Sequence, residues 1–154
     1  MNLSNTIEHK YPFKHWEFSN CLDNFTLDEI KNVSIPKGER AYDGTRAADH
    51  TGKGLDGKLR LFITRKDSEN FPNLIKLINT LQSQEYINKF SQYLNQDLSK
   101  SFVRLEVIGD SKGFWLKPHK DIKEKLMTMM IWTNTHNESK KLGTDLYNND
   151  FKLI

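Results

Sequence analysis

Two side chains that could bind a metal ion lie two positions apart in the stretch Gly113-Phe-Trp-Leu-Lys-Pro-His119-Lys-Asp121. In an extended segment, side chains at positions i and i+2 point to the same side of the chain. The imidazole of His119 and the carboxylate of Asp121 would therefore face one point, while Lys120 points elsewhere. An imidazole and a carboxylate are two of the three ligands in a 2-His-1-carboxylate site for non-haem Fe(II). The spacing predicts a metal-binding pair whose third ligand has to come from another part of the chain.

The H-x-[DE] pattern on its own is weakly specific, because five histidines and twenty acidic residues produce it by chance. The chain contains three such tripeptides: His15-Trp-Glu17, His119-Lys-Asp121 and His136-Asn-Glu138. The first lies in an aromatic segment, where a packed histidine is the simpler interpretation. The last lies in a polar loop, where both side chains would be solvated. The context of His119, and not its spacing to Asp121, therefore distinguishes the middle tripeptide.

Length and composition favour a single domain spanning residues 1–154, large enough to bury a core. Acidic and basic residues are interleaved and the net charge is only +3, which argues against a nucleic-acid partner. A basic surface with aromatic neighbours remains an alternative, although acidic residues interrupt it. That surface would contain Lys10, Lys14, Trp16, Lys120, Lys123 and Lys125.

The single cysteine, Cys21, is typical of a reducing compartment. The first twenty residues contain no apolar signal-peptide region, and no apolar run approaches 18 residues. These features predict a cytoplasmic protein without a membrane partner.

The N-terminal two thirds of the chain predict helices and two strands. Residues 1–10 are polar and are expected to fray, whereas the aromatic residues 11–18 suit a strand or a packed entry segment. Thr26 and Glu29 have the spacing of a capping box, which predicts a helix over residues 27–33. Residues 38–57 are expected to form a surface loop, with contact to a substrate as the alternative. Residues 58–64 alternate as in a strand.

Two amphipathic helices are predicted after this strand. The first begins near Pro72, and the second covers residues 83–94. Both are expected to pack against a sheet. Their apolar faces consist of Leu74, Leu77, Ile78 and Leu81, and of Tyr86, Ile87, Phe90 and Leu94.

Short strands are predicted in the C-terminal third, over residues 101–108, 114–118, 126–132 and 142–147. The strand at 126–132 would place Leu126, Thr128, Met130 and Trp132 on one face. Helices followed by strands that are joined by turns predict an α+β fold with a mainly antiparallel sheet. A sandwich or an incomplete jelly roll would satisfy this order.

Residues 101–147 resemble the Fe(II)/2-oxoglutarate-dependent dioxygenase superfamily, on its prolyl-hydroxylase-like branch. Five separate elements occur in the order typical of that family: a turn glycine, P-H-x-D, a basic residue, a strand ending in an aromatic turn, and a G-[GT]-x-L-[YF] strand. The matching residues are Gly113, Leu116, Pro118, His119, Asp121, Lys125, Thr128, Trp132, Asn134 and Gly143-Thr-Asp-Leu-Tyr147.

The resemblance implies a double-stranded β-helix (jelly-roll) core with N-terminal helices packed on its sheet. His119 and Asp121 would bind Fe(II), and the cosubstrate 2-oxoglutarate would chelate the same ion. Thr128, Met130 and Trp132 would line the cosubstrate pocket, with ordinary core packing as the alternative. The implied activity is hydroxylation of an unidentified small molecule or side chain, coupled to decarboxylation of 2-oxoglutarate, with ascorbate as an optional reductant.

The chain departs from the family pattern after this motif. The family's second histidine ligand, and the Arg or Lys that binds the far carboxylate of 2-oxoglutarate, lie some fifty or more residues beyond the H-x-D motif, whereas only 33 residues (154 − 121) follow Asp121 here. His136, the one downstream histidine, lies in the predicted polar loop. A truncated or impaired oxygenase is therefore expected, with a non-catalytic jelly-roll binding module as the alternative. An incomplete barrel would expose a sheet edge and favour self-association.

Overall fold

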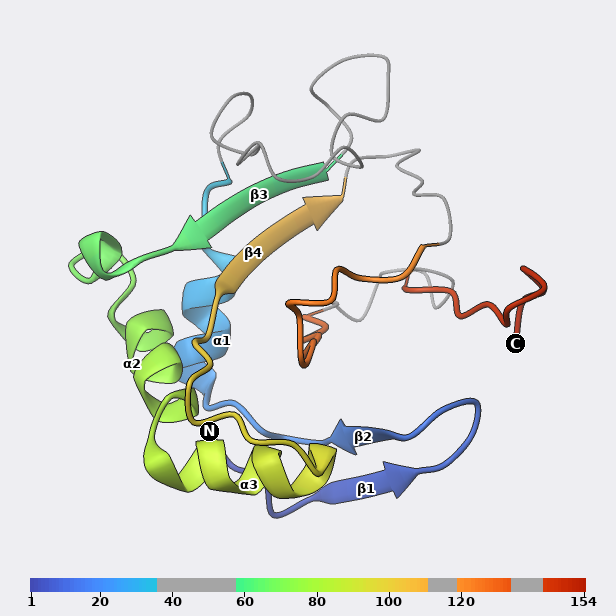
Figure 1. Cartoon of the computed structure of the whole chain (residues 1–154). Coiled ribbons are helices and arrows are strands. Elements are labelled where there is room, and N and C mark those ends of the chain that lie inside the picture. Colours follow the sequence, from blue (N-terminus) through green and yellow to red (C-terminus); the bar gives the residue numbers. More distant parts are fainter. Residues whose placement is uncertain (36–57, 111–118, 134–142) are drawn as a thin grey trace.

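The computed structural model describes residues 1–35, 58–110, 119–133 and 143–154 (Figure 1). In these residues the protein combines three α-helices with two separate two-stranded antiparallel sheets. The predicted mixture of helices and antiparallel strands is confirmed at this level. No helix among the described residues is long and apolar enough to cross a membrane.

The first sheet is a hairpin of β1 (Thr6–His9) and β2 (His15–Phe18). Its Trp16 ring stacks on Tyr93 with 5.2 Å between the ring centroids, and Phe18 also lies on Tyr93 at 6.4 Å. The prediction that residues 1–10 fray is wrong, because Leu3 is buried in the core and residues 6–9 pair with β2. A strand partner and an aromatic contact hold this polar segment in place.

Helix α1 (Asn24–Lys31) begins earlier than the predicted helix. Its N-cap is Asp23, whose Oδ1 accepts a hydrogen bond from the Thr26 backbone N–H at 2.7 Å. The predicted capping box is therefore wrong, and Thr26 is a buried residue within the helix. Glu29 instead reaches the start of α2, where its carboxylate accepts hydrogen bonds from the backbone N–H groups of Asn73 and Leu74. These bonds fasten α1 to α2.

Helices α2 (Pro72–Leu81) and α3 (Gln84–Leu94) confirm the two predicted amphipathic helices, and a short 3₁₀ helix, η3 (Arg65–Asp67), precedes them. Their predicted apolar faces are the ones that are buried, with Leu74 fully enclosed. The hydrophobic core is centred on α3 and includes chain segments from both sides of it. Its buried members are Leu3, Tyr86, Phe90 and Leu98.

The second sheet pairs β3 (Lys58–Ile63) with β4 (Leu105–Asp110) over six residues on each strand. The predicted strand at 58–64 is confirmed, whereas the one at 101–108 starts later and continues through Gly109, which the sequence assigned to a turn. A Cβ atom at Gly109 would lie 3.1 Å from Cδ1 of Ile35. The absence of a side chain therefore lets the strand pass close to the end of the segment that follows α1.

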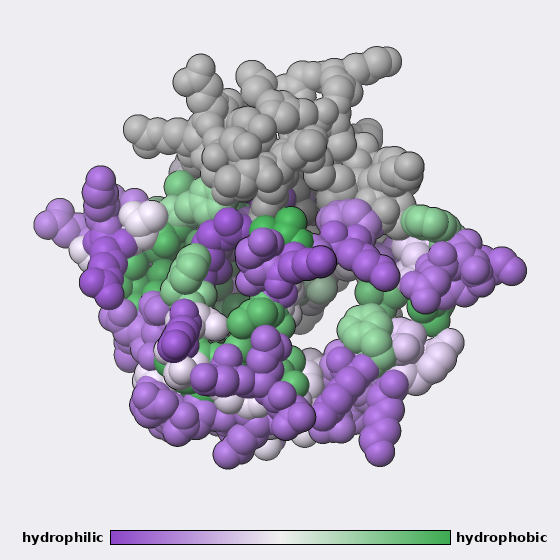
Figure 2. Space-filling view, in the orientation of Figure 1, coloured by the Kyte–Doolittle hydropathy of each residue, from purple (hydrophilic) through white to green (hydrophobic). Residues whose placement is uncertain are grey.

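The C-terminal segments form little regular structure. No strand forms over residues 126–132. In the described part of the strand predicted at 142–147, residues 143–147, a single bridge joins Tyr147 to Leu153. In the face shown in Figure 2, hydrophilic residues cover much of the described surface, and hydrophobic residues show between them. The segment 119–133 nevertheless contacts the core, because Met129 packs against the cluster around Phe90.

Candidate metal site

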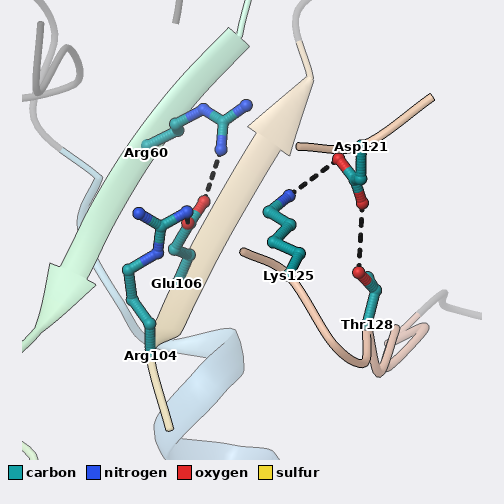
Figure 3. A network of polar contacts seen from close by, with 6 residues as sticks. All are labelled: Arg60, Arg104, Glu106, Asp121, Lys125 and Thr128. Carbon is teal, nitrogen blue, oxygen red and sulfur yellow. Dashed lines mark hydrogen bonds and ion pairs between the residues drawn. The ribbon is translucent and has the colours of Figure 1, made fainter. Parts of the chain in front are cut away.

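His119 and Asp121 lie at the start of the segment 119–133, which has irregular backbone. Figure 3 shows Asp121 between Lys125 and Thr128 of the same segment. His119 and Asp121 are both exposed, and the side chain of Asp121 retains 43% of its accessible surface. The turn at residues 123–124 brings the chain back toward Asp121. The side chains that surround this carboxylate consequently come from the same short segment.

Both oxygens of Asp121 accept hydrogen bonds. The Lys125 ammonium donates to Oδ1 at 2.9 Å, and the Thr128 hydroxyl donates to Oδ2 at 3.1 Å. Partial burial raises the pKa of Asp121, but the hydrogen bond and charge of Lys125, the hydrogen bond of Thr128 and the charge of His119 together bring the pKa below its usual value. The carboxylate is therefore held ionised, which is the form that binds a cation.

His119 and Asp121 lie two residues apart in the same exposed segment. They are the predicted metal ligands, and an imidazole with an ionised carboxylate is a suitable donor pair for Fe(II). Lys125 and Thr128 orient the carboxylate through their hydrogen bonds. The segment therefore offers one imidazole and one carboxylate as donors for a divalent ion.

The three residues predicted to line a cosubstrate pocket occupy the exposed side of this segment. Met130 and Trp132 are 55% and 56% exposed, and Thr128 is engaged with Asp121. The Met130 sulfur accepts a hydrogen bond from the Thr144 hydroxyl at 3.6 Å. Met129 packs against the hydrophobic core instead, and the predicted strand had placed it on the face opposite to Thr128, Met130 and Trp132.

An ion network on the β3–β4 ribbon, in which Arg60 and Glu106 are largely buried and Arg104 is partly exposed, escaped the sequence analysis (Figure 3). Arg60 of β3 and Arg104 both pair with Glu106 of β4, with Arg104 Nη2 3.0 Å from Glu106 Oε1. Arg104 also lies over the ring of Phe62, 5.4 Å from its centroid. Alternating charged residues in two predicted strands were the available signal. The strand register that makes them neighbours could not be read from the sequence.

Several residues and segments singled out in the sequence fall outside the described residues. These are the motif residues Gly113, Leu116, Pro118 and Asn134, together with His136, the predicted strand at 114–118 and the predicted loop at 38–57. A shallow depression near the end of α3, lined in part by Ser91, Asn95 and Asp97, contains none of the predicted ligands.

Comparisons with known proteins leave the chain without an assigned family. A scan against protein-family models, a search of curated proteins and a search of solved structures each gave no significant match. The functional argument therefore depends on the residues and their geometry.

Proposed function

We propose that this chain carries part of the metal centre of an Fe(II)- and 2-oxoglutarate-dependent oxygenase, with His119 and Asp121 as two of the iron ligands. The observation that supports the proposal is the Asp121 carboxylate, which the hydrogen bonds of Lys125 and Thr128 hold in place two residues after His119. In this proposal the β3–β4 ribbon and the segment 119–133 belong to a jelly-roll core.

The donor atoms fit a divalent iron ion. An ionised carboxylate offers about four lone-pair positions, so the bonds from Lys125 and Thr128 leave acceptor capacity for a metal. Imidazole and carboxylate donors together suit non-haem Fe(II). When bound, the iron and 2-oxoglutarate would supply the oxidation of a substrate C–H bond.

The residues of the chain would hold and orient these groups. Thr128 keeps Asp121 in place through its hydroxyl, and Lys125 balances the carboxylate charge. The exposed side chains of Met130 and Trp132 would provide an apolar contact for the cosubstrate. The substrate itself would be a small molecule or a side chain of another protein.

Binding of Fe(II) under anaerobic conditions tests the proposal. The unsubstituted chain should bind Fe(II), and His119→Ala or Asp121→Asn should lower the affinity at least tenfold. Lys120→Ala, which changes the residue between the two ligands, serves as the matched control and should bind like the parent. Equal affinity in all four proteins would refute the assignment of the ligands.

Turnover is measured separately, as succinate formed from 2-oxoglutarate in the presence of Fe(II) and ascorbate. Succinate above the level of the His119→Ala variant supports the oxygenase. Metal binding without succinate formation would favour the non-catalytic binding module.

A further inference from the structure

The β1–β2 hairpin places two histidines and one glutamate on its outer face. His9 and His15 are directly opposite each other in the strand register, and Glu17 follows His15 by two positions. Because side chains alternate along a strand, His15 and Glu17 point away from Trp16 and Phe18, whose rings lie on Tyr93. The outer face is therefore free of the packing that fixes the hairpin to α3.

The three side chains converge closely. One donor atom from each of them can be chosen so that all three lie within 4.8 Å of one another. The imidazole rings of His9 and His15 are stacked with 4.8 Å between their centroids, and His9 Nε2 lies 3.3 Å from Glu17 Oε2. The three groups form one cluster and not two separate pairs.

The hydrogen bonding of the two rings leaves nitrogen donors available. His15 Nδ1 lies 2.8 Å from the Phe13 carbonyl oxygen, an acceptor that fixes the proton on Nδ1 and leaves the lone pair on Nε2. His9 Nε2 is shielded from solvent and has no hydrogen-bond partner among the described residues, despite its approach to Glu17. A backbone carbonyl that orients an imidazole is the usual support of a metal-binding histidine.

We propose that His9, His15 and Glu17 form a binding site for Zn(II) that is separate from His119 and Asp121. Two imidazoles and one carboxylate are a ligand set that zinc takes in proteins with its fourth position open to water. Zinc–ligand distances of about 2.0–2.2 Å require donor atoms roughly 3.3 Å apart. The cluster is therefore wider than a closed site. The two imidazole planes are nearly parallel, at 12°, so the His9 ring has to turn about its side-chain torsions before a nitrogen of each ring can bind the same ion. The Glu17 side chain, 64% exposed, has the freedom to follow this movement.

The experiment uses the full chain with His119→Ala and Asp121→Asn as background, so that zinc binding at the first pair is removed. Equilibrium dialysis against Zn(II) should then give about one zinc per chain. Adding His9→Ala or His15→Ala should weaken binding at least tenfold, and Glu17→Gln should weaken it less. Failure of the iron site would leave this result unchanged, so the two proposals are tested independently.

Glu8→Gln is the matched control, since it makes the same change of charge on the opposite face of the same hairpin, where Glu8 pairs with Lys14 at 3.8 Å. It should bind zinc like the background chain. Amide hydrogen exchange provides a second readout, because zinc should slow exchange of the β1 and β2 amides in the background chain but not after His15→Ala. Zinc binding that is unchanged by the His9, His15 and Glu17 substitutions, or no binding in the background chain, would overturn the proposal.

Discussion

Replacing Lys125 by methionine is expected to strengthen Fe(II) binding at the proposed site. The Lys125 ammonium lies 2.9 Å from Asp121 Oδ1. A metal ion bound to this carboxylate at about 2 Å would lie within roughly 5 Å of the ammonium. The two positive charges therefore repel each other, and loss of the lysine removes this repulsion and frees one oxygen of Asp121.

The magnitude follows from Coulomb's law. Charges of +1 and +2 at about 5 Å repel by about 1.7 kcal/mol in water, which is the appropriate medium because Asp121 is 43% exposed. Screening at physiological ionic strength reduces this to about 1 kcal/mol, or about fivefold in affinity. The carboxylate remains ionised at neutral pH even when the lysine no longer lowers its pKa.

Anaerobic isothermal titration with Fe(II) measures this effect, and the difference should shrink at high salt. Lys123→Met is the control, because it removes the same charge from the same turn without removing the ion pair to Asp121. An unchanged or weaker affinity in Lys125→Met, or an equal gain in Lys123→Met, would refute the reasoning.

Three further predictions concern stability. The Glu29 carboxylate accepts hydrogen bonds from the first backbone N–H groups of α2, and Glu29→Gln removes its charge. This substitution should lower the free energy of unfolding, measured in urea, by about 1–2 kcal/mol. Glu85→Gln, at an exposed position, is the control and should have little effect. Leu74→Ala empties a fully buried position and should cost about 2–5 kcal/mol in the same assay, and a loss below 1 kcal/mol would contradict the core described here. In the folded protein the pKa of Asp121 is below its ordinary value of 3.8, so its contribution to stability is present above pH 3.8 and is lost as the pH falls through the folded pKa. Asp121→Asn should remove this part of the acid dependence of the unfolding free energy. An unchanged acid dependence would count against the Lys125 contact.

The helices could be predicted because their cause is local. The spacing of Leu74 and Leu77, and of Tyr86 and Phe90, is a property of neighbouring residues, and the structure buries these faces. The start of α1 was missed because two residues compete for the cap. Thr26 has the right spacing to Glu29, but the tertiary position of α2 draws Glu29 away.

Long-range partners account for the other differences. The polar residues 6–9 become a strand because β2 pairs with them and its aromatic side chains rest on Tyr93. The burial of residues 128–133 alternates as expected, but Met130 is on the exposed side and Met129 packs against the core. Which side faces the core depends on the tertiary contacts of this segment. The His9–His15 contact depends on a strand register that the sequence does not specify. At the proposed iron site, the spacing indicated His119 and Asp121, but only the structure identifies Lys125 and Thr128 as the partners of the carboxylate.

The most direct test of the proposed function is an anaerobic titration of the chain with Fe(II) and 2-oxoglutarate, followed by the charge-transfer absorption of the iron–2-oxo acid chelate. The proposal predicts a saturable absorption band in the parent chain and in His15→Ala, which changes only the hairpin cluster, and its loss in His119→Ala. A band of equal intensity in His119→Ala, or no band in the parent chain, would contradict the assignment of His119 and Asp121 as iron ligands.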